Sequence, residues 1–162
     1  MNPQQSSPQR HFDLLLKWIL WRSGWNADSK RNIPWSELPD YSDYPAVRSV
    51  VEDFFGLKIK GNGILRGGGC CDVSIDPRLV VRVESDLRRL EDLNGKKLFP
   101  IGETHQGSGV LLVDESGASY WLGESDSLLP LGMSFEKGLK SLLVNPFPSS
   151  SRSSPAPHRC QP

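Results

Sequence analysis

Two short apolar segments near the middle of the chain, residues 110–113 (VLLV) and 118–122 (ASYWL), are separated by only four residues. The four residues between them, DESG, favour a hairpin loop, and Gly117 can adopt the positive φ that such a loop needs. A connection this short makes the two segments neighbouring antiparallel strands. Further strand candidates lie at residues 57–60, 73–75, 79–83 and 98–101. The chain therefore predicts an antiparallel sheet of about five to six strands.

Apolar residues also recur with helical spacing. Residues 12–20 and 47–55 each carry large apolar side chains at i, i+3, i+4, i+7 and i+8, the stripe that an amphipathic helix buries. A more charged helix is expected over residues 84–93, and Ser134 can cap a last helix over residues 135–143. Helices first, a strand-rich middle and a helix last are typical of an α+β fold whose N-terminal and C-terminal helices pack on the antiparallel sheet.

The two ends of the chain differ in composition from the part between them. Residues 1–11 are polar and without periodicity, and residues 145–162 consist mainly of Ser and Pro. Neither end can bury a core, so we expect an N-terminal leader and a C-terminal tail that are both disordered. Residues 12–144 are expected to form a single globular domain.

Charge and composition exclude several classes of function. The 162 residues include 19 basic and 19 acidic side chains, whereas a dedicated nucleic-acid binder usually has a basic excess. The cysteines, Cys70, Cys71 and Cys160, form no C-x-x-C pair and the histidines are far apart in sequence, so no metal site is expected. The apolar run FDLLLKWILW is too short to span a bilayer, and no cleavage site follows it. We expect a soluble, cytoplasmic protein without metal or cofactor, and without direct contact to nucleic acid or membrane.

Two segments invite a catalytic interpretation. The glycine-rich residues 61–69 (GNGILRGGG) lack the G-K-[ST] ending of a P-loop, and Arg66 occupies the third glycine's place in G-x-G-x-x-G. Ser108 follows His105 by three residues, but the glycines of a nucleophile elbow and an orienting acid are missing. A flexible connection and a surface turn are the better interpretations, so we expect no catalytic residues. A small hydrolase that uses His105 and Ser108 is the alternative.

Charge is distributed unevenly along the chain. Six carboxylates and no Lys or Arg lie between residues 102 and 136. They belong to Glu103, Asp114, Glu115, Glu124, Asp126 and Glu136. These carboxylates can form a solvated hairpin rim, or a negative patch that steers and orients a basic partner. Most of the tryptophans are expected in the core, whereas an aromatic residue left exposed on the sheet, Tyr120 or Trp121, would anchor an interface.

Several short motifs follow one another along the chain. They are GW at residues 24–25 with Arg31, FGL at 55–57, IDP at 75–77, LFPIGE at 98–103, the hairpin with Gly117, and LGMSF at 131–135. Their order and spacing resemble the third family of the SUKH immunity-protein superfamily. The resemblance extends over roughly residues 16–143, which is nearly all of the expected domain.

This resemblance implies a function. Proteins of the superfamily are small α+β proteins encoded beside bacterial polymorphic toxins, and each blocks its cognate toxin domain, often a nuclease or a deaminase. The chain is therefore expected to be a stoichiometric inhibitor, a monomer or a weak homodimer, without catalysis. A regulatory scaffold is the alternative, because relatives outside toxin loci act as interaction modules. The residues expected to contact the toxin are Glu103, Asp114, Glu115, Tyr120, Trp121, Glu124 and Asp126.

Overall fold

The computed structural model describes residues 13–26, 31–60, 72–80, 84–104, 109–123 and 127–144. The α-helices are α1 (Leu14–Arg22), α2 (Pro45–Phe54), α3 (Glu84–Asn94) and α4 (Phe135–Val144). Short 3-10 turns are η1 (Trp35–Glu37), η2 (Pro39–Tyr41) and η3 (Pro77–Leu79). The strands are β1 (Leu57–Ile59), β2 (Val73–Ile75), β3 (Leu98–Thr104), β4 (Gly109–Asp114), β5 (Ser119–Gly123) and β6 (Leu128–Gly132).

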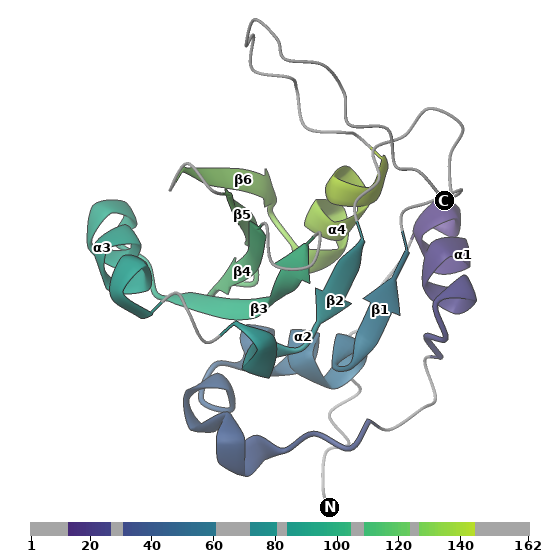
Figure 1. The fold of residues 1–162 in the computed structure, drawn as a ribbon, viewed down its shortest axis with the longest axis horizontal. Coiled ribbons are helices and arrows are strands. Elements are labelled where there is room, and N and C mark those ends of the chain that lie inside the picture. Colours follow the sequence, from purple (N-terminus) through teal and green to yellow (C-terminus); the bar gives the residue numbers. More distant parts are fainter. Residues whose placement is uncertain are drawn as a thin grey trace, which may run out of the picture.

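In the described part of the chain, the six strands form one sheet in which each strand pairs with the next, in the order β1-β2-β3-β4-β5-β6. All five pairings are antiparallel. Figure 1 shows α1 and α2 beside the first strands of this sheet and α4 next to its last strands. The predicted α+β fold, with N-terminal helices, an antiparallel sheet and a C-terminal helix, is confirmed.

The sheet separates two apolar clusters. Because consecutive strand residues point to opposite faces, Leu111 and Val113 of β4 belong to one cluster and Leu112 belongs to the other. The larger cluster also contains buried side chains of α1, α2 and α4, whereas Leu90 of α3 completes the smaller one. Figure 1 shows α3 at one end of the molecule and α1 at the other. The outer surfaces of these two helices therefore face different directions.

Strand β3 contains a bulge at its centre. Its pairing with β4 shifts register between Pro100 and Gly102, so Ile101 has no partner directly opposite it and is fully buried in the larger cluster. A β-carbon at Gly102 would lie 2.1 Å from the carbonyl oxygen of Ser74 on β2. Glycine is therefore needed at this place in the LFPIGE motif, because any side chain would push β2 and β3 apart.

Two strand assignments from the sequence differ from the structure. The prediction of a strand over residues 79–83 is wrong at its start, because Leu79 ends the 3-10 turn η3, and residues 81–83 lie outside the described part. Strand β6 is not among the predicted strands, because Pro130 interrupts its apolar pattern. Proline is tolerated there because, among the described strands, β6 pairs only with β5 and lies at the edge of the sheet.

The expectations for the chain ends concern residues that the structure does not describe. Residues 1–11 and 145–162 fall there, so the domain boundaries at residues 12 and 144 stay predictions. None of the described helices combines the length and the apolar character that a membrane crossing requires.

Candidate protein-binding surface

The β4–β5 hairpin closes around a buried carboxylate. The Asp114 side chain is 0% exposed. One of its oxygens accepts hydrogen bonds from the backbone N–H groups of Ser116 (2.9 Å) and Ala118 (3.0 Å). The other accepts from Lys96 Nζ (2.9 Å) and from the Tyr120 hydroxyl (2.9 Å). Asp114 therefore does not belong to a solvated rim, and its carboxylate organises the turn from within.

These contacts keep Asp114 ionised. Burial alone would raise the pKa of Asp114, but hydrogen bonds from Ser116, Lys96 and Tyr120 outweigh it and lower the pKa to about 2. Hydrogen bonds to Asp114 and Tyr120 raise the pKa of Lys96. At neutral pH the negative charge of Asp114 is consequently compensated by Lys96 within the fold.

The two aromatic residues predicted as anchors are both half-buried. Tyr120 and Trp121 are consecutive on β5, so their side chains point to opposite faces of the sheet. The Trp121 indole N–H donates to the Thr104 hydroxyl (3.1 Å). Its ring lies so close to two glycines that a β-carbon would approach it to 2.3 Å at Gly109 and to 2.2 Å at Gly123. Each aromatic ring is therefore held by contacts within the domain, and a partner on one face cannot use both.

The acidic residues do not form one continuous patch. Asp114 lies opposite Leu98, whereas Glu103 lies opposite Val110 at the other end of β3. Asp114 and Val110 are four positions apart on β4, which corresponds to roughly 13 Å along the strand. Glu115 is exposed in the turn and accepts a hydrogen bond from the Lys97 backbone N–H (3.4 Å). The remaining two predicted contacts, Glu124 and Asp126, lie outside the described residues.

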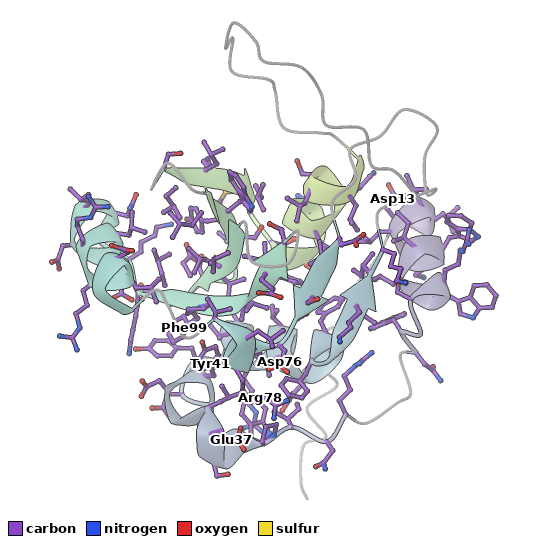
Figure 2. All side chains as sticks on the ribbon, viewed as in Figure 1. Asp13, Glu37, Tyr41, Asp76, Arg78 and Phe99 are labelled. Atoms are coloured by element: carbon purple, nitrogen blue, oxygen red, sulfur yellow. The ribbon has the colours of Figure 1, made fainter. Side chains whose placement is uncertain are left out.

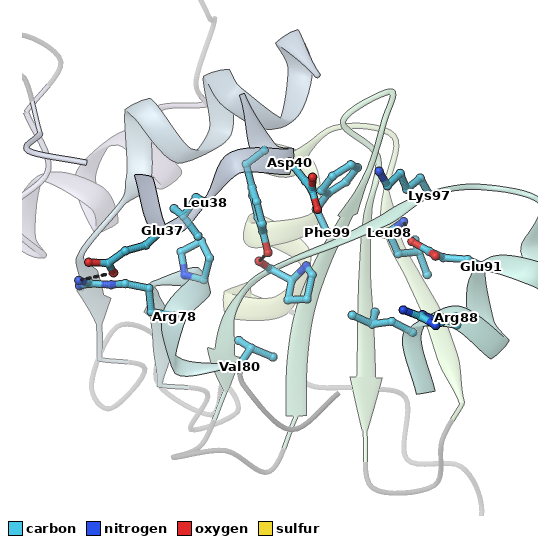
Figure 3. A pocket seen from close by; sticks show the side chains of 14 residues that line it. Glu37, Leu38, Asp40, Arg78, Val80, Arg88, Glu91, Lys97, Leu98 and Phe99 are labelled. Atoms are coloured by element: carbon cyan, nitrogen blue, oxygen red, sulfur yellow. Dashed lines mark hydrogen bonds and ion pairs between the residues drawn. The ribbon is translucent and has the colours of Figure 1, made fainter. Parts of the chain in front are cut away.

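A hollow of about 450 Å³ lies beside the hairpin, between the turns η1 to η3, helix α3 and the start of β3. Its apolar lining includes the buried side chains of Leu38, Leu98 and Phe99. Charged residues of both signs surround this lining, among them Asp40 and Arg88 (Figure 3). A hollow with an apolar floor and a charged rim suits a protruding side chain of a protein partner.

Polar contacts hold the wall of this hollow in place. The Tyr41 hydroxyl donates to the Pro100 carbonyl (2.7 Å), and burial raises the Tyr41 pKa, with Asp40 adding to the effect. Arg78 on η3 binds Asp76 (2.8 Å) and also reaches Glu37 on η1 (3.5 Å). Figure 2 shows Glu37, Arg78 and Asp76 close together on one side of the sheet, and Figure 3 marks the ion pair between Arg78 and Glu37.

Lys97 joins the hollow to the hairpin turn. Its side chain lines the hollow, and its ammonium group lies 5.1 Å from the Tyr44 ring and 5.5 Å from the Phe99 ring. Its backbone N–H contacts Glu115, as described above. We call the hollow together with the exposed Glu115 turn the hairpin–hollow surface. This surface carries charges of both signs, because only its Glu115 turn belongs to the acidic stretch of residues 102–136 and the hollow is lined by earlier residues.

The catalytic candidates are not placed by the structure. The glycine-rich residues 61–69 and the residues His105 and Ser108 lie outside the described part, as do all three cysteines. Within the described ranges, no group of three or more His, Cys, Asp or Glu side chains is arranged to hold a metal ion.

The structure also reveals exposed aromatic residues that the sequence reasoning missed. Trp21 on α1 is 71% exposed and Trp18 is 42% exposed. Together with Leu14 they occupy positions i, i+4 and i+7, the spacing of one helix face. This second apolar stripe on α1 was the signal in the sequence that could have identified them.

Comparison with known proteins agrees with the motifs. A model of the SUKH-3 immunity protein family matches residues 15–145. The chain belongs to the SUKH-3 immunity protein family. The matched region begins in α1 and ends just after α4, so it contains the whole sheet and its helices. The resemblance predicted from the sequence is confirmed. Searches among curated proteins and among solved structures gave no match.

Proposed function

We propose that this SUKH-3 protein is an immunity protein that binds a cognate bacterial toxin domain, a nuclease or a deaminase, and neutralises it by stoichiometric contact. The observation that supports the proposal is the family match over residues 15–145, which covers every described strand and, apart from the first residue of α1, every described helix. The protein acts in the cytoplasm as a monomer or weak homodimer. It catalyses no reaction, and it contacts neither nucleic acid nor membrane.

The hairpin–hollow surface is the proposed contact region. A nuclease needs basic groups around its phosphate-binding cleft, so exposed carboxylates can approach that cleft and compete for it. Glu115 is the exposed carboxylate of the described hairpin turn, and the half-buried Glu103 lies at the far end of β3. The contact residues that we retain are Glu103, Glu115, Tyr120, Glu124 and Asp126. Asp114 keeps the turn in shape for them. Trp121 points to the opposite face of the sheet from Tyr120, so a partner on this surface does not reach it.

Co-expression tests the proposed function directly. The gene for the toxin domain encoded next to this protein is expressed with and without it, and survival of the host cells is measured. Purified protein and a catalytically inactive form of the toxin are then mixed and the mass of the complex is determined. We expect protection and a complex of defined stoichiometry. Cell death despite high levels of the protein, or no complex at micromolar concentrations, would refute the proposal.

The contribution of Glu115 can be measured on the same complex. Glu115→Lys should slow association with a basic toxin surface and flatten its dependence on salt, because charge at the rim of an interface acts mainly on the association rate. Asp92→Lys makes the same charge change at another exposed position, on α3, and serves as the matched control. Equal association rates for the two variants would exclude Glu115 from the interface.

A further inference from the structure

Helix α1 is apolar on two opposite sides. Its inner side chains are at most 2% exposed and pack into the larger cluster; they are Leu16, Ile19 and Leu20. Its outer side chains are 84%, 42% and 71% exposed; they are Leu14, Trp18 and Trp21. At 100° per residue these outer positions lie within about 60° of one another, on the side of the helix opposite the inner three. An amphipathic helix that only covers its own core would carry polar residues there.

Two cations flank this stripe. Lys17 and Arg22 are exposed on either side of it, and the Arg22 guanidinium stacks on the Trp18 ring at 4.9 Å. The carboxylate nearest in sequence, Asp13, is already bound to Lys140 of α4. Among the described residues, neither Lys17 nor Arg22 has a carboxylate partner. We call Leu14, Trp18 and Trp21 with these two cations the α1 outer face.

The charges of this face indicate which occupant fits it. Two copies that met through this same face would bring four cations together, and among the described residues of the face no carboxylate is free to compensate them, which is repulsive. The chain's own end segments, residues 1–12 and 145–162, contain no Asp or Glu and so do not complement it either. Recognition of an anionic membrane typically uses clusters of four to eight Lys or Arg residues, and the α1 outer face has two. An acidic protein surface with an apolar hollow complements both the cations and the aromatic rings.

We propose that the α1 outer face anchors the toxin domain, and that the toxin presents to it an acidic surface around an apolar hollow. The proposal rests on the proposed function, and it requires the acidic surface of the toxin to be separate from the basic cleft that the hairpin–hollow surface approaches. Trp and Arg are the residue types most enriched among the few that dominate binding energy. Among the described residues at the hairpin–hollow surface, no aromatic side chain is exposed to the extent of Trp21, because Phe99 is buried and Tyr41 and the neighbouring Tyr120 are partly buried. The α1 outer face supplies the anchor that the sheet lacks.

Affinity measurements on the purified proteins test this proposal. The wild-type chain and its variants are titrated with the catalytically inactive toxin from the neighbouring gene, and the dissociation constants are compared. Trp21→Ala should weaken binding at least about 30-fold, the loss typical of an interface hot spot. Leu93→Ala removes a side chain that is equally exposed (75%) but lies on α3, and it should bind like the wild type. Both variants should unfold at the wild-type urea concentration, because neither side chain is buried.

Charge reversal provides a second, independent readout. Lys17→Glu combined with Arg22→Glu should slow association with an acidic toxin surface by about tenfold or more and should reverse its salt dependence. If Trp21→Ala and the charge reversal both leave the affinity and the association rate at their wild-type values, the α1 proposal is overturned while the proposed function stands. Failure of the wild-type chain to bind the toxin at all would overturn the proposed function, and the α1 proposal with it.

The other occupants are separate arms of the same experiment. The wild-type chain is mixed with vesicles of phosphatidylcholine containing phosphatidylserine, and its mass in solution is measured over a range of protein concentrations. We expect no vesicle binding and no dimer that depends on Trp21. If the wild-type chain binds vesicles and Trp21→Ala abolishes this binding, the α1 outer face binds a lipid surface. If the wild-type chain forms a dimer that Trp21→Ala abolishes, the face binds a second copy. Either result would overturn the proposal.

Discussion

Replacing Asp114 with Asn should destabilise the protein by about 2 kcal/mol at neutral pH. The pKa of Asp114 is lowered from 3.8 to about 2 in the folded chain. Each pH unit between the folded and unfolded values corresponds to about 1.4 kcal/mol, so ionised Asp114 stabilises the fold by about 2 kcal/mol relative to its neutral form. Asn has the same shape as Asp, and its side-chain oxygen can accept the hydrogen bonds from the backbone N–H groups of the turn. It offers no carboxylate to Lys96 and Tyr120. Urea unfolding followed by tryptophan fluorescence measures the difference, which is a large fraction of a typical domain stability.

The pH dependence of this loss has a definite sign. Asp114 has a folded pKa below its unfolded one, so its contribution is complete above about pH 4 and is lost as the pH falls through about 2. The difference in unfolding free energy between wild type and Asp114→Asn should therefore be constant from pH 7 to about pH 4. Below about pH 4 this difference should decrease and approach zero at about pH 2. Glu115→Gln, in the same turn but exposed, should cost less than about 0.5 kcal/mol and serves as the control.

Two results would refute this reasoning. A loss no larger than that of Glu115→Gln at pH 7 would mean that the carboxylate is not held as the distances indicate. If the full difference in unfolding free energy persists at pH 2, shape and packing at the site stabilise the hairpin and charge does not.

Three further substitutions probe the fold, each measured by urea unfolding. Gly102→Ala should cost several kcal/mol, because its β-carbon would collide with the backbone of Ser74, and a loss below about 1 kcal/mol would show that β2 and β3 can separate freely. Gly123→Ala should cost about 1 to 3 kcal/mol and change the fluorescence of Trp121, whose ring must move; an unchanged spectrum would contradict that contact. Tyr41→Phe should cost about 1 kcal/mol through its lost hydrogen bond to β3, and a neutral result would show that this bond adds nothing.

The helices and the hairpin could be predicted because their signals are local. The stripe at Val47, Val50, Val51 and Phe54 is at most 2% exposed, as an apolar repeat of helical spacing predicts. Gly117 has φ of +89°, the conformation that the four-residue loop needs. In both cases the residues that decide the structure lie within one or two turns of chain, so the pattern contains all the information required.

The charge pattern was misleading because pairing in a sheet is not local. The stretch from residue 102 to residue 136 contains no Lys or Arg, yet Lys96 lies against Asp114 and the Lys97 backbone contacts Glu115. These two lysines precede the acidic stretch in sequence. Antiparallel pairing of β3 with β4 places them beside the turn that follows β4. Counting charges along the sequence cannot reveal this neutralisation before the strand register is known.

The outer face of α1 shows a different limit. Periodicity identifies the stripe that a helix can bury, but a helix with apolar residues on two opposite sides offers two such stripes, and spacing alone does not say which one the core uses. That choice depends on the neighbouring elements. In this fold α2 and α4 cover the same side of the sheet, so α1 needs only one of its faces to complete the larger cluster, and its two tryptophans are left outside. Leaving two large aromatic rings in water contributes nothing to folding, and among the described residues the two flanking cations have no carboxylate partner. The partner proposed above for the α1 outer face would cover the rings and compensate the charges.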